Sequence, residues 1–432
     1  MNIDPVGAAL LFGGFAVLLL LRVPIALSLA MSSMGAALWL DIPMPVIGQK
    51  MVQGLNSFPL LAIPFFILAG EIMATGGIAR RLIDFASVLV GWLRGGLAML
   101  NVVASTFFGG ISGSAVADTS SIGAVMIPMM RRQGYRPAYA VGVTISSAAQ
   151  GVLIPPSHNM IIFALAAGGG VSIGGVFMAG LVPGIALGLL LLVTCYLLAR
   201  RHNHPRGEPI PMRDVPRVVL QGLLGVLTPV IVIGGILSGV FTATESAAIA
   251  CVWAFLITFG VYREVPLRAL VGMLQRTMRT LATVLFLIAA AGAYGYLLTV
   301  MQLPAALTQW LTGLTENPIL LLLLCNLLLI MLGAVLDMAP LILITTPILL
   351  PVVTSVGMDP MQFGVMLMLN LAIGLITPPV GSVLFVGSAV GKVRIEEASR
   401  GVLPFYVPLV IALLLVTYVP EFSLTLPRLL GF

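Results

Sequence analysis

A short polar stretch between two apolar runs constrains the fold of this chain more than any other feature. Residues 109–121 read Gly-Gly-Ile-Ser-Gly-Ser-Ala-Val-Ala-Asp-Thr-Ser-Ser and are mostly small or polar. The flanking runs, 97–108 and 122–130, are shorter than the about 20 apolar residues that a helix needs to cross a bilayer. We therefore predict a helical hairpin that enters the membrane and turns back at a tip buried in protein or lining a wet cavity, since lipid cannot satisfy its backbone.

An ordinary kinked helix packed through small residues is the alternative interpretation of this stretch. Asp118 weighs against it, because an ionisable side chain inside a membrane protein is costly and usually functional. A second stretch with glycine and proline at matching positions favours the hairpin. Three pairs of positions are separated by 223 residues: Gly110 and Gly333, Pro128 and Pro351, and the Pro-Pro pairs at 155–156 and 378–379. The chain is thus predicted to contain one structural unit twice.

Composition places the whole chain in a membrane. Of its 432 residues, 59% are hydrophobic and only 8% are charged, a bias that a soluble core does not need. The net charge of +6 therefore reports on topology rather than on nucleic-acid binding, which we do not expect. The predicted fold class is an all-α polytopic membrane protein.

The apolar runs and their breaks predict the order of elements. The expected spans are roughly 7–21, 24–40, 59–75, 138–165, 176–199, 218–240, 242–262, 280–300, 360–388 and 402–420, and the re-entrant hairpins are 95–130 and 317–352. Two of these spans, 138–165 and 360–388, are predicted to be broken. Amphipathic pieces at 78–93 and 303–314 are expected along the membrane surface. A first repeat (1–199) and a second repeat (218–432) are joined by a cytoplasmic linker (200–217).

Basic residues predict the orientation of the two repeats. With the N-terminus outside, only Lys50 and Arg428 of the 21 basic residues fall outside the membrane, as the positive-inside rule requires. Each half contains five spans, and this odd number inserts the second copy upside down. The first hairpin then enters from the cytoplasm and the second from the outside. Inverted repeats with broken helices that meet near the midplane are typical of secondary transporters.

Each predicted hairpin is followed by a span that paired prolines interrupt. A proline removes a backbone donor and clashes with the carbonyl four residues earlier, so two in succession should unwind the helix. Carbonyls freed in this way coordinate sodium in transporters with broken helices. We predict one sodium site between the tip from Gly109 to Ser114 and the break at 151–156. A second is predicted between Gly333 and the break at 374–379, where Thr377 adds an oxygen.

The helix ends that follow the breaks predict an anion site. They carry partial positive charge, with Ser157 and Asn159 at the first end and Ser382 at the second. A carboxylate bound near the tips would rely on these ends, on hydroxyls such as that of Ser114 and on bound sodium, because no basic residue is predicted near the midplane. Asn370, just before the second break, is a further predicted contact.

Three ionisable residues keep two interpretations each. Asp118 either helps to hold sodium or substrate, or caps the returning hairpin helix, and Asp337 has the same two interpretations. His158 is either a proton or substrate group or a hydrogen-bonded residue at a helix start. Glu71 and Glu245 are expected to be structural.

The motifs at 109–118, 154–157 (Ile-Pro-Pro-Ser) and 376–381 (Ile-Thr-Pro-Pro-Val-Gly) resemble the large, DctM-type membrane subunit of tripartite ATP-independent periplasmic (TRAP) transporters. The resemblance covers essentially the whole chain. It implies a sodium-driven, elevator-type importer of a small organic acid in the bacterial inner membrane. It also implies two partners, namely a separate small four-helix membrane subunit and a periplasmic protein that captures the substrate. The implied sodium ligands are Ser112, Gly151, Ile154 and Pro156 in the first copy and Gly333, Gly374, Thr377 and Pro379 in the second.

Three other functions are alternatives to a TRAP transporter subunit. A stand-alone sodium/dicarboxylate carrier shares the inverted-repeat hairpins and differs in needing no external binding protein. A channel would need a continuous polar pore face, whereas the polar tips here are isolated between apolar runs. An intramembrane enzyme is not expected, because no Ser/His/Asp set, metal-spaced histidine cluster or paired carboxylate is present.

Overall fold

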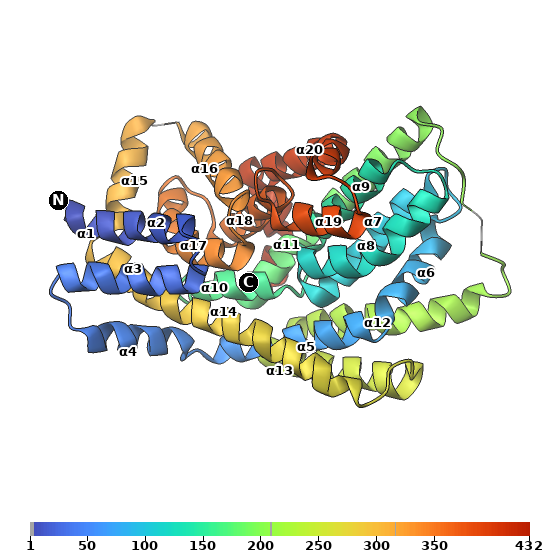
Figure 1. Cartoon of the computed structure of the whole chain (residues 1–432), viewed down its shortest axis with the longest axis horizontal. Coiled ribbons are helices and arrows are strands. Elements are labelled where there is room, and N and C mark those ends of the chain that lie inside the picture. Colours follow the sequence, from blue (N-terminus) through green and yellow to red (C-terminus); the bar gives the residue numbers. More distant parts are fainter. Residues whose placement is uncertain (1–3, 208–209, 316) are drawn as a thin grey trace.

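The computed structural model describes residues 4–207, 210–315 and 317–432, and most of them are helical (Figure 1). Within these ranges there is no β-strand; an isolated bridge pairs Arg94 with Arg206. This agrees with the predicted all-α class. The helices divide into a frame and a core, described in turn below.

The frame consists of helices that lie side by side along the lower and left parts of Figure 1. Helix α14 packs on α3, α4 and α5, and α13 packs on α5 and α12. The frame elements are α1 (Pro5–Ala8), η1 (Ala9–Gly13), α2 (Gly14–Leu20), α3 (Ile25–Trp39), α4 (Met44–Leu55), η2 (Phe58–Leu61), α5 (Ala62–Thr75), α6 (Ile78–Val90), α12 (Val215–Leu237), α13 (Ala243–Phe255), η3 (Leu256–Tyr262), α14 (Ala269–Val300) and α15 (Leu303–Leu314).

The core contains both predicted hairpins and both predicted breaks. Its helices are α7 (Gly96–Ser112), α8 (Ala115–Arg132), α9 (Pro137–Gly151), α10 (His158–Ala166), α11 (Ile173–Arg201), α16 (Pro318–Gly333), α17 (Met338–Ser355), α18 (Pro360–Leu375), α19 (Ser382–Gly391), α20 (Ile395–Tyr418) and α21 (Pro420–Leu429). We call α7–α8 the first hairpin, α16–α17 the second hairpin, residues 152–157 the first break and residues 376–381 the second break.

The same pairings occur in both halves of the core. Helix α7 packs on α9 as α16 packs on α18, so each hairpin lies against the first part of its own broken helix. The second part of each broken helix contacts the other half instead: α10 packs on α17, and α19 packs on α8. Both hairpins and both breaks are therefore brought to the centre of one core.

Seven of the described helices are long and apolar enough to cross a membrane. They are Phe58–Thr75, Ile173–Arg201, Val215–Leu237, Ala243–Tyr262, Ala269–Val300, Met338–Ser355 and Ile395–Tyr418. The predicted spans 7–21 and 24–40 coincide with shorter apolar helices. Met338–Ser355, in contrast, lies within the predicted second hairpin and reaches the length of a span.

Some predicted boundaries were wrong, because packing and charge pairing extend or create helices that hydropathy does not reveal. The predicted span 280–300 begins earlier, at Ala269, and Arg276 in its added turns pairs with Glu71 at 2.6 Å. Helix α4 was not predicted, since it has no long apolar run. It packs on α14 where Gly54 approaches the carbonyl of Ile288. Helix α21 was also missed.

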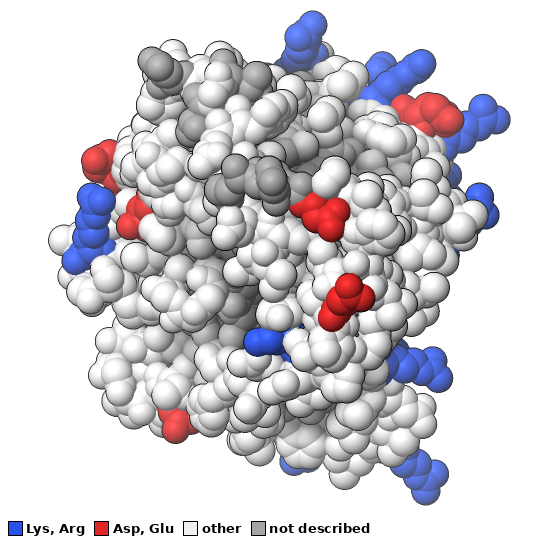
Figure 2. Space-filling view, turned by 90° about the vertical axis from the view of Figure 1, so that its left-hand side faces the viewer, with Lys and Arg blue, Asp and Glu red and all other residues white. Residues whose placement is uncertain are grey.

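A salt bridge and a helix cap stabilise the frame, in agreement with the structural roles expected of two glutamates. Glu71 pairs with Arg276, and Glu245 forms a capping box with Thr242 at the start of α13. Such a box satisfies two otherwise unpaired backbone donors. Elsewhere the surface carries few charges: Figure 2 shows mostly uncharged residues at the end of the molecule that lies at the left of Figure 1.

Candidate functional site

The first hairpin meets the first break through two glycines. A Cβ added to Gly109 would lie 2.4 Å from the Cα of Gly151, so the two backbones touch and only hydrogen fits between them. The tip itself turns at Gly113, whose φ of +60° favours glycine. Its N–H donates to the carbonyl of Gly109 at 2.8 Å. The predicted neighbours Gly109 and Gly151 are thus in contact.

Asp118 lies behind this contact and is almost fully buried, with 1% of its surface exposed. One carboxylate oxygen, Oδ1, accepts a hydrogen bond from Ser105 at 3.0 Å, whereas Oδ2 has no hydrogen-bond partner. A Cβ at Gly151 would be 3.3 Å from that Oδ2. A buried unpaired carboxylate oxygen is costly, so Asp118 fits a cation better than it fits packing alone.

The interpretation of Asp118 as a helix cap is wrong. Ser114 is the N-cap of α8, and its hydroxyl accepts a hydrogen bond from the N–H of Ala117 at 3.3 Å. Ser112 contacts this turn as well, because its hydroxyl accepts a hydrogen bond from the N–H of Ser114 at 3.4 Å. Both predicted serines therefore lie in the tip, with the hydroxyl of Ser114 engaged in capping.

Polar groups at the end of the first break face the tips of both hairpins. Asn159 donates to the carbonyl of Gly113 at 3.3 Å and contacts the sulfur of Met338 in α17 at 3.7 Å. It therefore bridges the first hairpin to the second. Ser157 precedes α10, and its buried hydroxyl has no hydrogen-bond partner. His158 lies against the first tip, since a Cβ at Gly113 would be 3.1 Å from its Nδ1.

The second hairpin and second break repeat the glycine contact. A Cβ added to Gly374 would lie 2.5 Å from the carbonyl carbon of Gly333 and 2.6 Å from its Cα. The structural counterpart of Gly333 is therefore Gly109, and the predicted correspondence with Gly110 was wrong by one residue. Sequence spacing could not detect this slip because residues 109 and 110 are both glycine.

Two carbonyl oxygens of the second break converge on a small cradle. Gly381 has φ +43°, and a Cβ there would be 2.7 Å from the carbonyl oxygen of Thr377 and 2.9 Å from that of Leu375. The N–H groups of Val380 and Gly381 both donate to the carbonyl of Ala334, at 3.1 and 3.0 Å, which anchors the break to the second tip. Oxygen donors gathered without a side chain between them suit a small hard cation.

Tyr406 is a site residue that sequence reasoning missed. Its hydroxyl donates to the carbonyl of Ile376 at 3.1 Å and lies 3.0 Å from the hydroxyl of Thr377. Thr377 in turn donates to the carbonyl of Ile373 at 2.6 Å. The hydroxyls of Tyr406 and Thr377 have one proton each and together make three contacts. The contact with Tyr406 therefore restricts the orientation of the lone pairs of Thr377. No pattern in the sequence placed α20 beside this break.

The remaining predicted residues lie less centrally. Asn370 donates to Asn326 at 2.7 Å and to the carbonyl of Met366 at 2.8 Å, in a buried network within the second half, although its Oδ1 has no partner. Ser382 donates to Asp337 at 3.4 Å, at the start of α19. Asp337 occupies the N-cap position of α17 without a capping hydrogen bond from its side chain. The roles of these three residues stay predictions.

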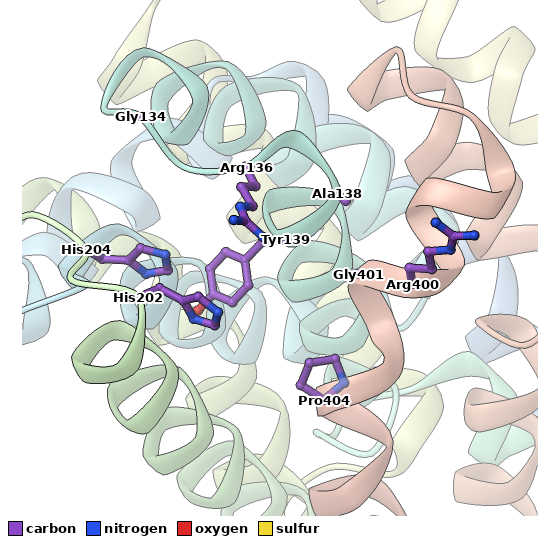
Figure 3. Close-up of a pocket in the computed structure, with 9 residues that line it drawn as sticks. All are labelled: Gly134, Arg136, Ala138, Tyr139, His202, His204, Arg400, Gly401 and Pro404. Carbon is purple, nitrogen blue, oxygen red and sulfur yellow. The ribbon is translucent and has the colours of Figure 1, made fainter.

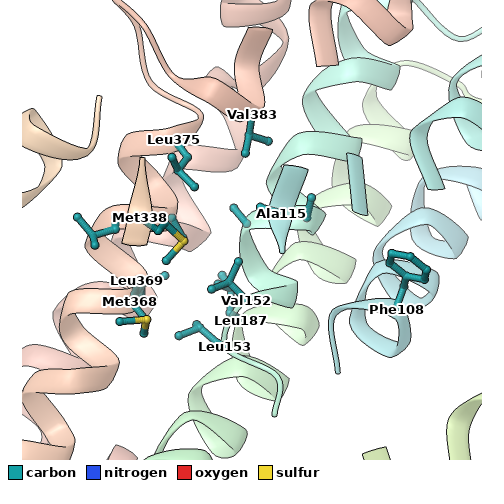
Figure 4. Close-up of a cluster of buried hydrophobic side chains, with 14 of the residues drawn as sticks. Phe108, Ala115, Val152, Leu153, Leu187, Met338, Met368, Leu369, Leu375 and Val383 are labelled. Atoms are coloured by element: carbon teal, nitrogen blue, oxygen red, sulfur yellow. The ribbon is translucent and has the colours of Figure 1, made fainter. Parts of the chain in front are cut away.

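Apolar side chains enclose the region between the tips. Figure 4 shows Val152 and Leu153 of the first break, with Leu187 nearby, between Met338 of the second hairpin and Phe108 of the first. Among the described residues no Lys or Arg is buried, and no group of three His, Cys, Asp or Glu residues could hold a metal ion. Backbone carbonyls, hydroxyls, the amides of Asn159 and Asn370 and the Asp118 carboxylate therefore supply oxygen atoms in this region.

Sequence comparisons with known proteins point to one family. A family model described as "Tripartite ATP-independent periplasmic transporter, DctM component" matches residues 12–422. A sialic acid TRAP transporter large permease protein of Vibrio cholerae is 40% identical, over 89% of this chain and 90% of that protein. A C4-dicarboxylate TRAP transporter large permease protein of Pseudomonas aeruginosa is also 40% identical, over 88% and 89%. These relatives are transporter permeases and not enzymes.

A solved transporter structure shares the fold. The YdaH transporter of Alcanivorax borkumensis matches with a TM-score of 0.60 at 16% sequence identity, covering 91% of this chain and 89% of that one. At this identity the similarity bears on the arrangement of helices alone.

Proposed function

The chain belongs to the DctM family of TRAP transporters, and we propose that it is the large permease subunit of a sodium-coupled importer of small organic anions in the bacterial inner membrane. The observation that carries the proposal is the duplicated contact between a hairpin and a break, Gly109 with Gly151 and Gly333 with Gly374. Each contact joins a hairpin to the last turn of the helix that leads into its break. The unwound break therefore follows beside a buried tip, an arrangement that secondary transporters use for ion sites.

The proposal includes two inverted repeats that move as an elevator. Support comes from the crossed pairing of α10 with α17 and of α19 with α8, which a twofold relation between the halves would generate. The frame helices would stay in place while the core, with both hairpins, carries its cargo across. Helix α5 of the frame packs against the first tip at Gly70, where a Cβ would be at an ordinary contact distance of 3.4 Å from the Cα of Ser112.

Two sodium ions would be co-transported with the substrate. The first would be bound by the tip from Gly109 to Ser112 and the break residues Gly151, Ile154 and Pro156, with Oδ2 of Asp118 close by. The second would be bound near Gly333, Gly374, Thr377 and Pro379, where the carbonyls of Leu375 and Thr377 converge. Asp118, whose Oδ2 has no hydrogen-bond partner, would add electrostatic stabilisation to sodium at the first site.

The transported molecule would be a carboxylate. The two relatives described above are named for sialic acid and for C4-dicarboxylates, both of which carry that group. With no buried Lys or Arg among the described residues, the carboxylate would depend on the N-terminal ends of α10 and α19, on bound sodium and on neutral donors. The candidate contacts are Ser114, Asp118, Ser157, Asn159, Asn370 and Ser382.

The permease would work with a small four-helix membrane subunit and a periplasmic protein that delivers the substrate. Membership of the TRAP family supports both partners. The alternative is a stand-alone sodium/dicarboxylate carrier, which would bind its substrate directly from solution.

Substrate uptake should therefore require the capture protein. In proteoliposomes with both membrane subunits and an inward sodium gradient, we expect free organic acid alone to give uptake near background, because the chain must receive its substrate from that protein. Adding the purified capture protein loaded with radiolabelled acid should start uptake. Equal uptake with and without it would favour the stand-alone carrier.

Tyr406→Phe should weaken sodium binding at the second site about tenfold. The substitution keeps the ring and removes the hydroxyl, so the Ile376 carbonyl loses its donor and the Thr377 hydroxyl keeps only its hydrogen bond to the carbonyl of Ile373. The sodium concentration that half-saturates thermal stabilisation of the purified protein measures the effect. Tyr418→Phe is a matched control, because Tyr418 lies on the same helix and bonds instead to the carbonyl of Ile319. An unshifted sodium curve for Tyr406→Phe would remove this residue from the site.

A further inference from the structure

A basic cavity lies away from the transport site, where the linker returns to the core. It has a volume of about 320 Å³ and opens between the start of α9, the residues just after α11 and helix α20. Figure 3 shows its lining residues, with His202 and His204 beside Tyr139 and Arg136, and Arg400 across the opening on α20. The lining is Gly134, Arg136, Ala138, Tyr139, His202, His204, Arg400, Gly401 and Pro404.

The lining has basic groups and no acidic one. Neither Arg136 nor Arg400 forms a salt bridge within the described part of the chain. Arg400 also borders a neighbouring cavity that contains Glu396 and Glu397, so Arg136 is the main positive charge, and the two histidines add ring nitrogens that can donate to an anion. Like charges that share a cavity repel one another, and a bound anion would relieve that repulsion.

The histidines are held in place by rings of α9 and its preceding turn. His204 packs on Tyr135 and Tyr139, with ring centroids 4.4 and 5.0 Å apart, and stacks on His202 at 5.7 Å. Its Nδ1 is buried and has no hydrogen-bond partner in the described chain. Burial, and secondarily the charge of His202, lowers the pKa of His204, so an anion would also stabilise its charged form.

The linker is fixed against neighbouring backbone at this point. The N–H of Gly95 donates to the carbonyl of Pro205 at 3.0 Å, and the N–H of His204 donates to the carbonyl of Ala199. On the other side of the cavity α9 and α20 touch through backbone, since a Cβ at Gly401 would overlap the carbonyl of Ala138. The backbone that carries the two histidines is thus fixed by these hydrogen bonds.

We propose that this cavity binds a phosphate group, supplied by a phospholipid headgroup or by a soluble phosphate ester. Arg136 provides a planar fork that matches phosphate oxygens, the histidines provide ring N–H donors, and Arg400 completes the far side. At about 320 Å³ the cavity is large enough for a headgroup of this kind. Its position implies that the ligand would tie the linker to α9 and α20, independently of which acid the permease carries.

The test uses the purified full chain in neutral detergent. Its melting temperature is measured with sn-glycerol 3-phosphate against sodium chloride at equal ionic strength and equal sodium. Retained phospholipid is measured by mass spectrometry on the intact protein. For a soluble ligand we expect glycerol phosphate to raise the melting temperature, and Arg136→Gln and His204→Ala each to weaken its half-saturation about tenfold. For a lipid headgroup we expect no such shift, but a retained phospholipid that both variants lose.

Arg132→Gln serves as the matched control, because Arg132 is an exposed arginine near the same turn that does not line the cavity. It should behave as the wild-type chain in both measurements. Arg136 is itself exposed, so its substitution should leave the fold intact, which the unliganded melting temperature checks. If neither ligand is detected, or if both cavity variants bind as the wild type does, the proposal is overturned.

Discussion

Replacing sodium with choline should reduce uptake by the reconstituted complex to background, even when a proton gradient is imposed. The cause would lie in the two proposed sites, where carbonyl oxygens at the breaks and the unpaired Oδ2 of Asp118 lie close to the hairpin tips. Without a cation these oxygens repel an incoming carboxylate. A tenfold sodium gradient supplies about 1.4 kcal/mol per ion. Two coupled sodium ions should therefore support a substrate accumulation of about a hundredfold.

Radiolabelled substrate delivered by the capture protein would be followed in proteoliposomes with sodium, potassium or choline outside. Thermal unfolding in the same series of salts is an independent measurement, because a ligand that binds only the folded protein raises its stability. Of the three cations, only sodium should raise the thermal unfolding temperature of the chain. Uptake and stability that do not differ between sodium and choline would contradict the proposed coupling.

Gly374→Ala should lower sodium-driven uptake about a hundredfold. The added methyl group would lie 2.5 Å from the carbonyl carbon of Gly333 and 2.9 Å from the nitrogen of Ala334. All of these neighbours are backbone atoms, so no flexible side chain can move aside and the second hairpin itself must shift. A displacement of about 1 Å at a site that depends on geometry can cost a factor of 100, and the same shift should abolish stabilisation by the second sodium ion.

Gly295→Ala is the matched control, since it adds the same methyl group to a helical glycine of α14 with nothing within 4 Å. That variant should transport normally. Uptake is normalised to folded protein, measured by size-exclusion chromatography of the purified complex, which separates a transport defect from loss of protein. Normal sodium-dependent uptake by folded Gly374→Ala would show that the contact between the second hairpin and its break is not part of the ion site.

Much of the architecture followed from local pattern. Helix turns and helix interruptions are found where glycines and paired prolines predicted them, because a proline removes a backbone donor and clashes with the preceding turn. That the paired helices re-enter the membrane stays a prediction. Helices α4 and α21 were missed for the converse reason. Their sequences lack a long apolar run, and contacts with α14 and α11 stabilise them in place.

The candidate site was only partly predictable. The glycines at the tips and breaks could be selected from sequence, since close approach of two backbones requires them. Which glycine pairs with which could not, because residues 109 and 110 are identical and only packing distinguishes them. Local pattern also left Asp118 open. Its interpretation as a cap is removed because Ser114 caps α8, and its role in holding sodium or substrate stays a prediction.

The chain's membrane location, its helical class and the positions of its hairpins and breaks are properties of hydropathy and of glycine and proline chemistry, which act over a few residues. Asn159 and Met338 are 179 positions apart in the chain, and Tyr406 and Thr377 are 29 apart. The lining of the basic cavity runs from Gly134 to Pro404, which are 270 positions apart. Such contacts depend on how whole helices pack against one another. They are therefore decided by the packing of α10 on α17 and of α20 on α18 and α9.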